Sequence, residues 1–376
     1  MNKIGIVGYG KMGREIFRFY YPQCRNTSFV IFCRHDQERY KAELDKELQK
    51  ILRRKRITEE IFEFQRENLR FTDNWSDFSD CDMIIESTAE NIEVKKSIFA
   101  SIESVVNKEC LLLTNTSSLS IEKIFEDTAH RERCFGLHFF YPLKLTSFAE
   151  LNLIPQNDTK DVERVKQWVE SHGKRTLEFY QPFHMYLNQF IFTAISAAIY
   201  FRNESGCSVD SLEKAFGEFF PIGGIFGLID SIGLGILTQN AGSFRMKRTE
   251  NLHNYGIDMM KKWTDCGFSK EPNTFLAEIR DHEKNVPEKE IDFPIECIIA
   301  LLMNEAICAA EECHTESELL IEALQDSIGI AEPFSVYYEK ITADSLWNMS
   351  AKLHENNPEI FPLPNEKNKW GKYFNQ

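Results

Sequence analysis

The stretch that decides the fold begins with Lys3-Ile4-Gly5-Ile6-Val7 and continues as Gly8-Tyr9-Gly10-Lys11-Met12-Gly13. The first five residues predict a buried strand, and the apolar spacing that follows predicts a helix to about Tyr21. Gly8 permits a tight turn, Gly10 lets a phosphate approach the backbone, and Gly13 lets the helix pack closely on the strand. The amide groups of a helix N-terminus attract anions. The stretch therefore predicts a dinucleotide-binding turn, with Gly8, Gly10, Lys11, Met12 and Gly13 as cofactor-binding residues.

Strand-like and helical segments alternate through the first half of the chain. A highly charged segment, residues 37–67, predicts two helices that are broken near residues 56–58. Short connections between alternating strands and helices indicate an α/β Rossmann-type fold, a doubly wound and mostly parallel sheet. Further strands are expected at residues 29–33, 83–86, 111–114, 134–139, 148–154 and 176–180.

Helical patterns replace the strands after about residue 185. Residues 197–216 align without gaps with residues 305–324, which indicates two related helical blocks. We therefore expect all-α C-terminal domains after the sheet. The expected division is an NAD(P)-binding Rossmann-type domain over 1–183, a helical domain over 184–290 and a second, degenerate helical domain over 291–376.

Composition excludes several classes of protein. The formal net charge of −14 argues against a general nucleic-acid or membrane-surface binder. The ten cysteines include no CxxC pair, which argues against a zinc site and fits reduced thiols. The first residues, MNKIGIVGYG, lack signal-peptide architecture, and apolar runs such as residues 190–201 are too short to cross a bilayer. We expect a cytoplasmic protein without a metal, nucleic-acid or membrane partner.

The end of the second strand bears on the choice between NAD and NADP. An acidic residue commonly holds the adenosine ribose at this point, but here Arg34 and His35 follow the strand and Asp36 comes two residues late. A guanidinium can pair with the 2′-phosphate of NADP. Arg34 therefore slightly favours NADP, with Asp36 turning back onto the ribose of NAD as the alternative.

Four segments carry a family resemblance. Residues 86–95, ESTAENIEVK, resemble the E-A-x-x-E-N-x-x-x-K segment of the 3-hydroxyacyl-CoA dehydrogenase family, and residues 115–119, NTSSL, resemble its N-T-S-S-L strand end. Residues 136–142, GLHFFYP, resemble its G-x-H-F-F-N-P motif. Residues 221–234, PIGGIFGLIDSIGL, look like its P-x-G-P-F-E-L-x-D-x-x-G-L segment. Their order and spacing agree with the family over nearly the whole chain.

The resemblance implies an acid/base pair. It makes His138 the general base that takes the proton of the 3-hydroxyl group, and Glu150 the acidic partner that orients the imidazole. Ser117 and Asn188 match family residues that bind the substrate. The alternatives are a buried core histidine at 138, a helix N-cap at Ser117, and a cap or core hydrogen bond at Asn188.

The same resemblance extends the cofactor site. Glu90 and Lys95 match residues on the nicotinamide side of the cofactor, and Asn115 matches a residue at the adjoining strand end. Glu90 as a first-turn helix residue is the alternative.

The chain also departs from the family pattern around the substrate. Tyr141 replaces an Asn, and residues 143–148 lack the usual P-V-M-K-L pattern. Phe183-His184 replaces the end of a P-G-F segment, and Gln189 stands where Arg is usual. These departures indicate retained hydride transfer on an altered acyl substrate. The alternative is a non-catalytic protein, like the family's lens-crystallin relatives.

A dense basic cluster lies in the charged helical segment. It contains Arg53, Arg54 and Lys55, which we expect to bind the phosphates of CoA because this hairpin borders the CoA site in the family. Docking of an acyl carrier protein and a merely solvated helix face are the alternatives.

The sequence thus predicts an oxidoreductase of fatty acid metabolism that interconverts an (S)-3-hydroxyacyl-CoA and a 3-oxoacyl-CoA with NAD(P). The alternatives are the same chemistry on an acyl-carrier-protein thioester, or oxidation of a non-thioester hydroxy acid. Two helical blocks suggest a monomer with an internal pseudo-dimer, with a homodimer as the alternative.

Overall fold

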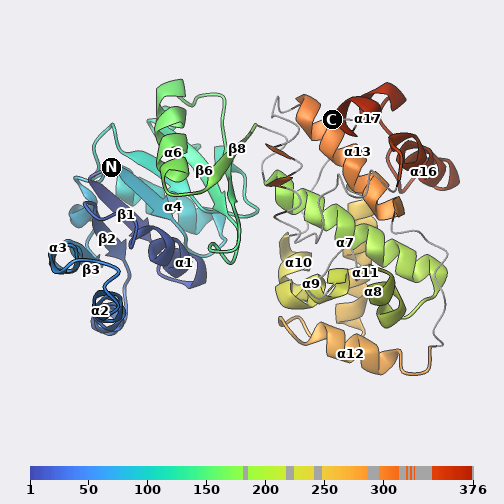
Figure 1. Ribbon diagram of the computed structural model, residues 1–376, viewed down its shortest axis with the longest axis horizontal. Helices are drawn as coiled ribbons and strands as arrows, with labels where there is room; N and C mark the ends of the chain where they lie inside the picture. Colours follow the sequence, from blue (N-terminus) through green and yellow to red (C-terminus); the bar gives the residue numbers. More distant parts are fainter. Residues whose placement is uncertain are drawn as a thin grey trace. The chain divides into compact units, whose positions relative to one another are not determined.

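The computed structural model describes most of the chain in two compact units, Met1–His184 and Met185–Gln376 (Figure 1). The described residues are 1–180, 185–216, 224–240, 248–286, 296–312, 319–320, 322–323, 326 and 341–374. The chain therefore divides beside the boundary expected at 183/184. The boundary expected at 290/291 lies outside the described residues, as do Phe183-His184 and part of the 221–234 segment.

The first unit is built on one eight-stranded sheet in the order β3-β2-β1-β4-β5-β6-β7-β8. Neighbouring strands are parallel except β6 and β7, which are antiparallel. The crossover between β1 and β4 creates a switch point, where α/β proteins bind ligands at the carboxyl ends of the strands. The expected doubly wound sheet is confirmed. The strands are β1 (Lys3–Val7), β2 (Ser28–Phe32), β3 (Leu69–Thr72), β4 (Met83–Glu86), β5 (Leu111–Thr114), β6 (Cys134–Phe139), β7 (Phe148–Asn152) and β8 (Arg175–Phe179).

Helices connect the strands of this unit. The two helices expected in residues 37–67 are present, and Thr58 caps the second by accepting a hydrogen bond from the Ile61 amide. The α-helices are α1 (Lys11–Tyr20), α2 (Gln37–Arg53), α3 (Glu59–Glu67), α4 (Ile92–Glu103), α5 (Ile121–Ile124) and α6 (Thr159–Ser171), and the 3-10 helices are η1 (Trp75–Phe78) and η2 (Arg131–Arg133).

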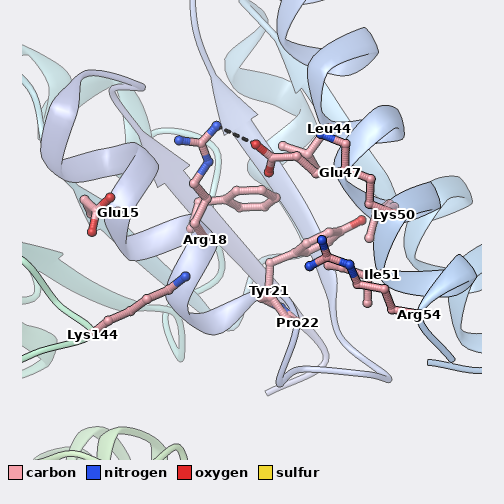
Figure 2. A pocket seen from close by; sticks show the side chains of 12 residues that line it. Glu15, Arg18, Tyr21, Pro22, Leu44, Glu47, Lys50, Ile51, Arg54 and Lys144 are labelled. Atoms are coloured by element: carbon pink, nitrogen blue, oxygen red, sulfur yellow. Dashed lines mark hydrogen bonds and ion pairs between the residues drawn. The ribbon is translucent and has the colours of Figure 1, made fainter. Parts of the chain in front are cut away.

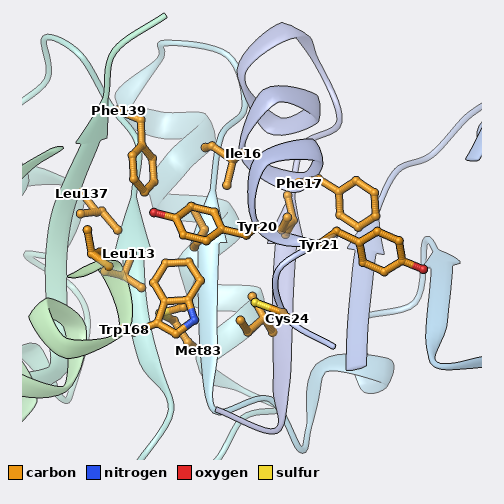
Figure 3. Close-up of a cluster of buried hydrophobic side chains, with 14 of the residues drawn as sticks. Ile16, Phe17, Tyr20, Tyr21, Cys24, Met83, Leu113, Leu137, Phe139 and Trp168 are labelled. Carbon is orange, nitrogen blue, oxygen red and sulfur yellow. The ribbon is translucent and has the colours of Figure 1, made fainter. Parts of the chain in front are cut away.

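Aromatic packing fixes α1 against the sheet (Figure 3). Tyr20 of α1 stacks on Trp168 of α6 with ring centroids 4.2 Å apart, and it also contacts Phe139 at the end of β6. Phe17, one turn earlier, stacks on Tyr21 at 4.5 Å. These rings are buried, and burying each contributes a few kcal/mol to folding, about 1.5–3 for a Phe-sized side chain. The core thereby ties the helix that follows the glycine turn to the strand that carries His138.

Every element that the structure describes in the second unit is a helix. Helix α7 packs against both α11 and α13, and α13 packs against α16 and α17. Residues 297–310 of α13 are all buried. No helix among the described residues is long and apolar enough to cross a membrane. The helices are α7 (Tyr186–Ser205), α8 (Val209–Phe216), α9 (Gly224–Ile232), α10 (Leu234–Asn240), α11 (Glu250–Asp265), α12 (Phe275–His282), α13 (Glu296–Glu312), α16 (Ala343–Asn356) and α17 (Lys367–Phe374).

Candidate active site

The glycine turn has the geometry that a bound pyrophosphate needs. Gly8 has φ +97°, and a Cβ there would lie 2.5 Å from the Ser87 carbonyl oxygen. A Cβ at Gly13 would lie 2.0 Å from the Gly8 carbonyl oxygen, so no larger residue fits where α1 crosses β1. A Cβ at Gly10 would have no described atom within 4 Å apart from its own chain neighbours. The turn is therefore closed against the sheet at Gly8 and Gly13 and open at Gly10, where a phosphate can approach the backbone.

A groove of about 700 Å³ continues from this turn. Phe32 and Trp75 form part of its wall and stack on each other with centroids 3.9 Å apart. Arg34 and His35 also line the groove, whereas the Asp36 carboxylate pairs with Arg39 at 2.9 Å. The aromatic wall, the open turn and the basic rim fit the adenosine half of a dinucleotide.

His138 and Glu150 form a buried pair at the same edge of the sheet. The antiparallel register of β6 and β7 sets these two residues directly opposite each other. His138 Nδ1 lies 2.6 Å from a Glu150 carboxylate oxygen, and His138 is only 5% exposed. The carboxylate can only accept, so Nδ1–H donates. The Asn115 side chain joins β5 to this site by accepting a hydrogen bond from the Phe139 amide at 3.0 Å.

Glu90 holds the loop that carries Ser117. One Glu90 oxygen accepts hydrogen bonds from the Thr116 hydroxyl at 2.6 Å, the Ser118 hydroxyl at 2.8 Å and the Ser117 amide at 2.9 Å. Partial burial raises the pKa of the Glu90 carboxyl, but the Lys95 ammonium and these hydrogen bonds offset it, so that the pKa lies below its usual value. Glu90 is therefore ionised at neutral pH and fixes the position of Ser117.

Lys95 forms ion pairs with both Glu90 and the buried Glu86. Its Nζ lies 2.9 Å from both carboxylate oxygens of Glu86 and 3.4 Å from Glu90, and the residue is 1% exposed. The hydroxyl groups of Thr88 and Thr114 also donate to Glu86, each at 2.6 Å. These contacts give Lys95 a role in holding the site together, and its expected contact with the cofactor stays a prediction.

A second pocket, of about 440 Å³, lies between α1, α2 and the loop after β6 (Figure 2). Arg54 lines it together with Arg18, Lys50 and Lys144, over an apolar floor that includes Tyr21. Arg18 pairs with Glu47 at 2.8 Å. Three cationic residues were predicted to bind the substrate, and of these only Arg54 lines this pocket. Its sequence neighbours Arg53 and Lys55 are exposed to solvent.

The comparisons with known proteins agree with these features. The family model described as 3-hydroxyacyl-CoA dehydrogenase, NAD binding domain, matches residues 3–181. The first unit of the chain is therefore similar to the NAD-binding domain of the 3-hydroxyacyl-CoA dehydrogenases. The chain is also similar to the glyoxysomal fatty acid beta-oxidation multifunctional protein MFP-a of Brassica napus, with 25% identity over 296 residues. That alignment covers 77% of this chain and 40% of the relative, so the chain spans less than half of that relative's length.

Two further relatives extend the comparison. A 3-hydroxybutyryl-CoA dehydrogenase of Bradyrhizobium diazoefficiens is 28% identical over 240 residues, which cover 62% of this chain and 80% of that protein. The solved structure of 3-hydroxybutyryl-CoA dehydrogenase from Escherichia coli K12 has a TM-score of 0.75 at 16% identity and covers 96% of both chains. The second likeness shows a shared fold.

The residues that resemble the family's site motifs lie in both units of this chain. His138, Glu150, Ser117, Glu90 and Asn115 come together at one edge of the sheet in the first unit. Asn188 lies in the second unit, in the first turn of α7, where it is half-buried. Among the described residues, no group of three or more His, Cys, Asp or Glu side chains is placed to hold a metal ion.

Two cations of the second pocket, Arg18 and Lys144, were not predicted from the sequence. Arg18 reads as an ordinary polar position of an amphipathic helix, and Lys144 lies in a loop that departs from the family pattern. Their distance along the chain hides their shared pocket. The helical periodicity of α1 was the signal that could have indicated Arg18. It places Arg18 one turn before the C-cap residue of the helix, Tyr21.

The ion cluster at Lys95 predicts a large stability difference between two adjacent lysines. Lys95→Met leaves Glu86 and Glu90 without their cation, and we expect it to lower the free energy of unfolding by about 3–5 kcal/mol in denaturant titrations. Lys96→Met is the matched control, because Lys96 pairs with Glu126 and Asp127 at the surface and should change stability little. Equal losses in the two variants would contradict the structural role of Lys95.

Proposed function

We propose that this protein interconverts an (S)-3-hydroxyacyl-CoA and the corresponding 3-oxoacyl-CoA with NAD(P), using His138 as the general acid/base. The observation that carries the proposal is the buried His138–Glu150 pair, 2.6 Å apart, at the carboxyl edge of the sheet. Because β1, β4, β5 and β6 run parallel, their carboxyl ends share this edge with the glycine turn. This arrangement supports a reaction in which a dinucleotide and a proton acceptor act on one side of the sheet.

The chain's own residues account for the movement of the proton. Glu150 accepts from Nδ1–H of His138 and so directs Nε2 toward the substrate. Nε2 takes the proton of the 3-hydroxyl group during oxidation and returns it during reduction, and the Glu150 carboxylate stabilises the imidazolium formed. Ser117, held by Glu90, donates a hydrogen bond to the same substrate oxygen. A nicotinamide dinucleotide held at the glycine turn by Gly8, Gly10 and Gly13 would accept or supply the hydride.

The role of His138 is tested by turnover. We expect His138→Ala to lower the rate of acetoacetyl-CoA reduction by about 10²- to 10⁴-fold, because the general acid is lost. Oxidation of NADH and of NADPH, followed by absorbance, measures the rate. His130→Ala is the matched control, since His130 lies in the same unit and pairs with Glu132 at the surface.

Two results would contradict this function. Unchanged turnover in His138→Ala would exclude His138 as the acid/base. Cofactor binding without turnover of any CoA thioester would exclude the CoA reaction. It would favour a carrier-protein thioester, a free hydroxy acid or a non-catalytic role.

The second pocket supports CoA as the carrier of the acyl group. Arg54, Lys50 and Lys144 offer cations beside an apolar floor, which suits a phosphate-bearing nucleotide. We expect Arg54→Glu to raise KM for acetoacetyl-CoA about tenfold at low salt, because it reverses one charge at a phosphate site. KM for acetoacetyl-pantetheine, which lacks the nucleotide, should not change.

Arg66→Glu supplies the control for this experiment, because Arg66 is an exposed residue of α3 that pairs with Glu63. A rise in KM for both thioesters would place Arg54 outside the CoA site. Faster turnover of an acyl-carrier-protein thioester than of the CoA thioester would favour the carrier-protein alternative.

The residues that line the groove beyond the glycine turn support a slight preference for NADP over NAD. Arg34 and His35 line it, and the carboxylate of Asp36 is engaged by Arg39. We expect Arg34→Ala to weaken NADPH binding about tenfold, since a charge-assisted contact with the 2′-phosphate is lost, and to leave NADH binding unchanged. Arg25→Ala, an exposed position before β2, is the control. Equal effects on both nucleotides, measured by fluorescence titration, would exclude the NADP preference.

The helical unit suggests a monomeric assembly. Helix α13 is buried against α7 along residues 297–310, as expected if the second helical block covers a surface that a second chain would otherwise cover. We therefore favour an internal pseudo-dimer over a homodimer. We propose a cytoplasmic location on the basis of the sequence. The word glyoxysomal in the name of the Brassica napus relative describes that protein.

A further inference from the structure

An unusual contact joins the glycine turn to the strand that carries His138. Lys11 is the first residue of α1, and its Nζ lies 3.8 Å from the centre of the Tyr141 ring. Tyr141 follows His138 by three residues and is 53% exposed. It stands where the family pattern has Asn. The site therefore contains a cation–π pair that the family motif does not provide.

Electrostatics explains why the pair matters at this position. The N-terminus of a helix carries partial positive charge and repels the ammonium group of Lys11. The face of an aromatic ring attracts a cation when the two are within about 6 Å. Tyr141 therefore offers Lys11 a partner that the helix end does not. Lys11 follows Gly10 directly, so its side chain extends from the backbone of the turn that is open to phosphate.

The loop that carries Tyr141 is itself anchored. Lys174, 2% exposed, donates hydrogen bonds to the Leu143 carbonyl at 2.8 Å and to the Thr146 carbonyl at 2.6 Å. A buried ammonium group that satisfies two loop carbonyls fixes the loop backbone. Tyr141 is thus presented from a fixed loop, although its ring is half exposed.

We propose that Tyr141 is a positioning residue for the dinucleotide: its ring holds the Lys11 ammonium group in place for the pyrophosphate. Binding then does not require an exposed lysine side chain to be ordered, which otherwise costs rotamer entropy. The inference rests on the proposed function only for dinucleotide binding, and it adds a residue that determines affinity.

A double-mutant cycle tests the proposal. We expect Tyr141→Leu and Lys11→Met each to weaken NADH or NADPH binding about fivefold, in the range of a cation–π contact. The double variant should bind no more weakly than Lys11→Met alone, because Tyr141 acts through Lys11. Tyr141→Phe keeps the aromatic ring and should bind the nucleotide as tightly as the unaltered chain does. Fluorescence titration of the reduced nucleotide measures all four.

Tyr180→Leu is the matched control, because Tyr180 is an exposed tyrosine of the same unit at 48%. The proposal is overturned by unchanged or tighter binding in Tyr141→Leu, by additive effects of the two substitutions, or by failure of Tyr141→Phe to restore binding. Dinucleotide binding without turnover would remove the proposed reaction and leave this cycle measurable. Absence of binding to the unaltered chain would overturn both.

Discussion

The ion cluster of Glu86, Lys95 and Glu90 is the interaction on which the rest of the site depends. Glu86 ends β4 at the switch point, opposite Val7 of β1, and so the cluster lies beside the glycine turn. Lys95 connects it to α4, and Glu90 connects it to the loop after β5. Burying such charges is costly unless each is paired, so the pairing fixes the relative positions of three segments.

The second constraint is the reversal of one strand. If β6 and β7 were parallel, a long crossover would have to connect them. Two residues that face each other across these strands would then lie far apart in sequence. The antiparallel step allows a short loop to connect the strands and sets Glu150 against His138. The same loop carries Lys144, which lines the second pocket, and Tyr141, whose ring contacts Lys11 at the glycine turn. One change of direction thus joins the His138–Glu150 pair to the glycine turn and to the second pocket.

The sequence predicted the parts of this molecule that follow from strong local patterns. The strands from β4 to β6 are apolar runs, and the glycine turn needs glycine for steric reasons that are visible in the sequence. Strand β3 was missed because Leu69–Thr72 is a short edge strand with alternating polarity after a charged helix. The burial of Lys95 was missed because a lysine on a helix is normally exposed. Pockets that join distant segments have no local signature.

The burial of α13 has a consequence for the size of the protein. A surface helix keeps a polar face for water, but residues 297–310 retain none, and α7 and α16 cover them. A chain that ended at residue 286 would expose the apolar side of α7 to solvent. The apolar sides of α7 and α13 therefore cover each other, and removal of either helix would expose the other to water.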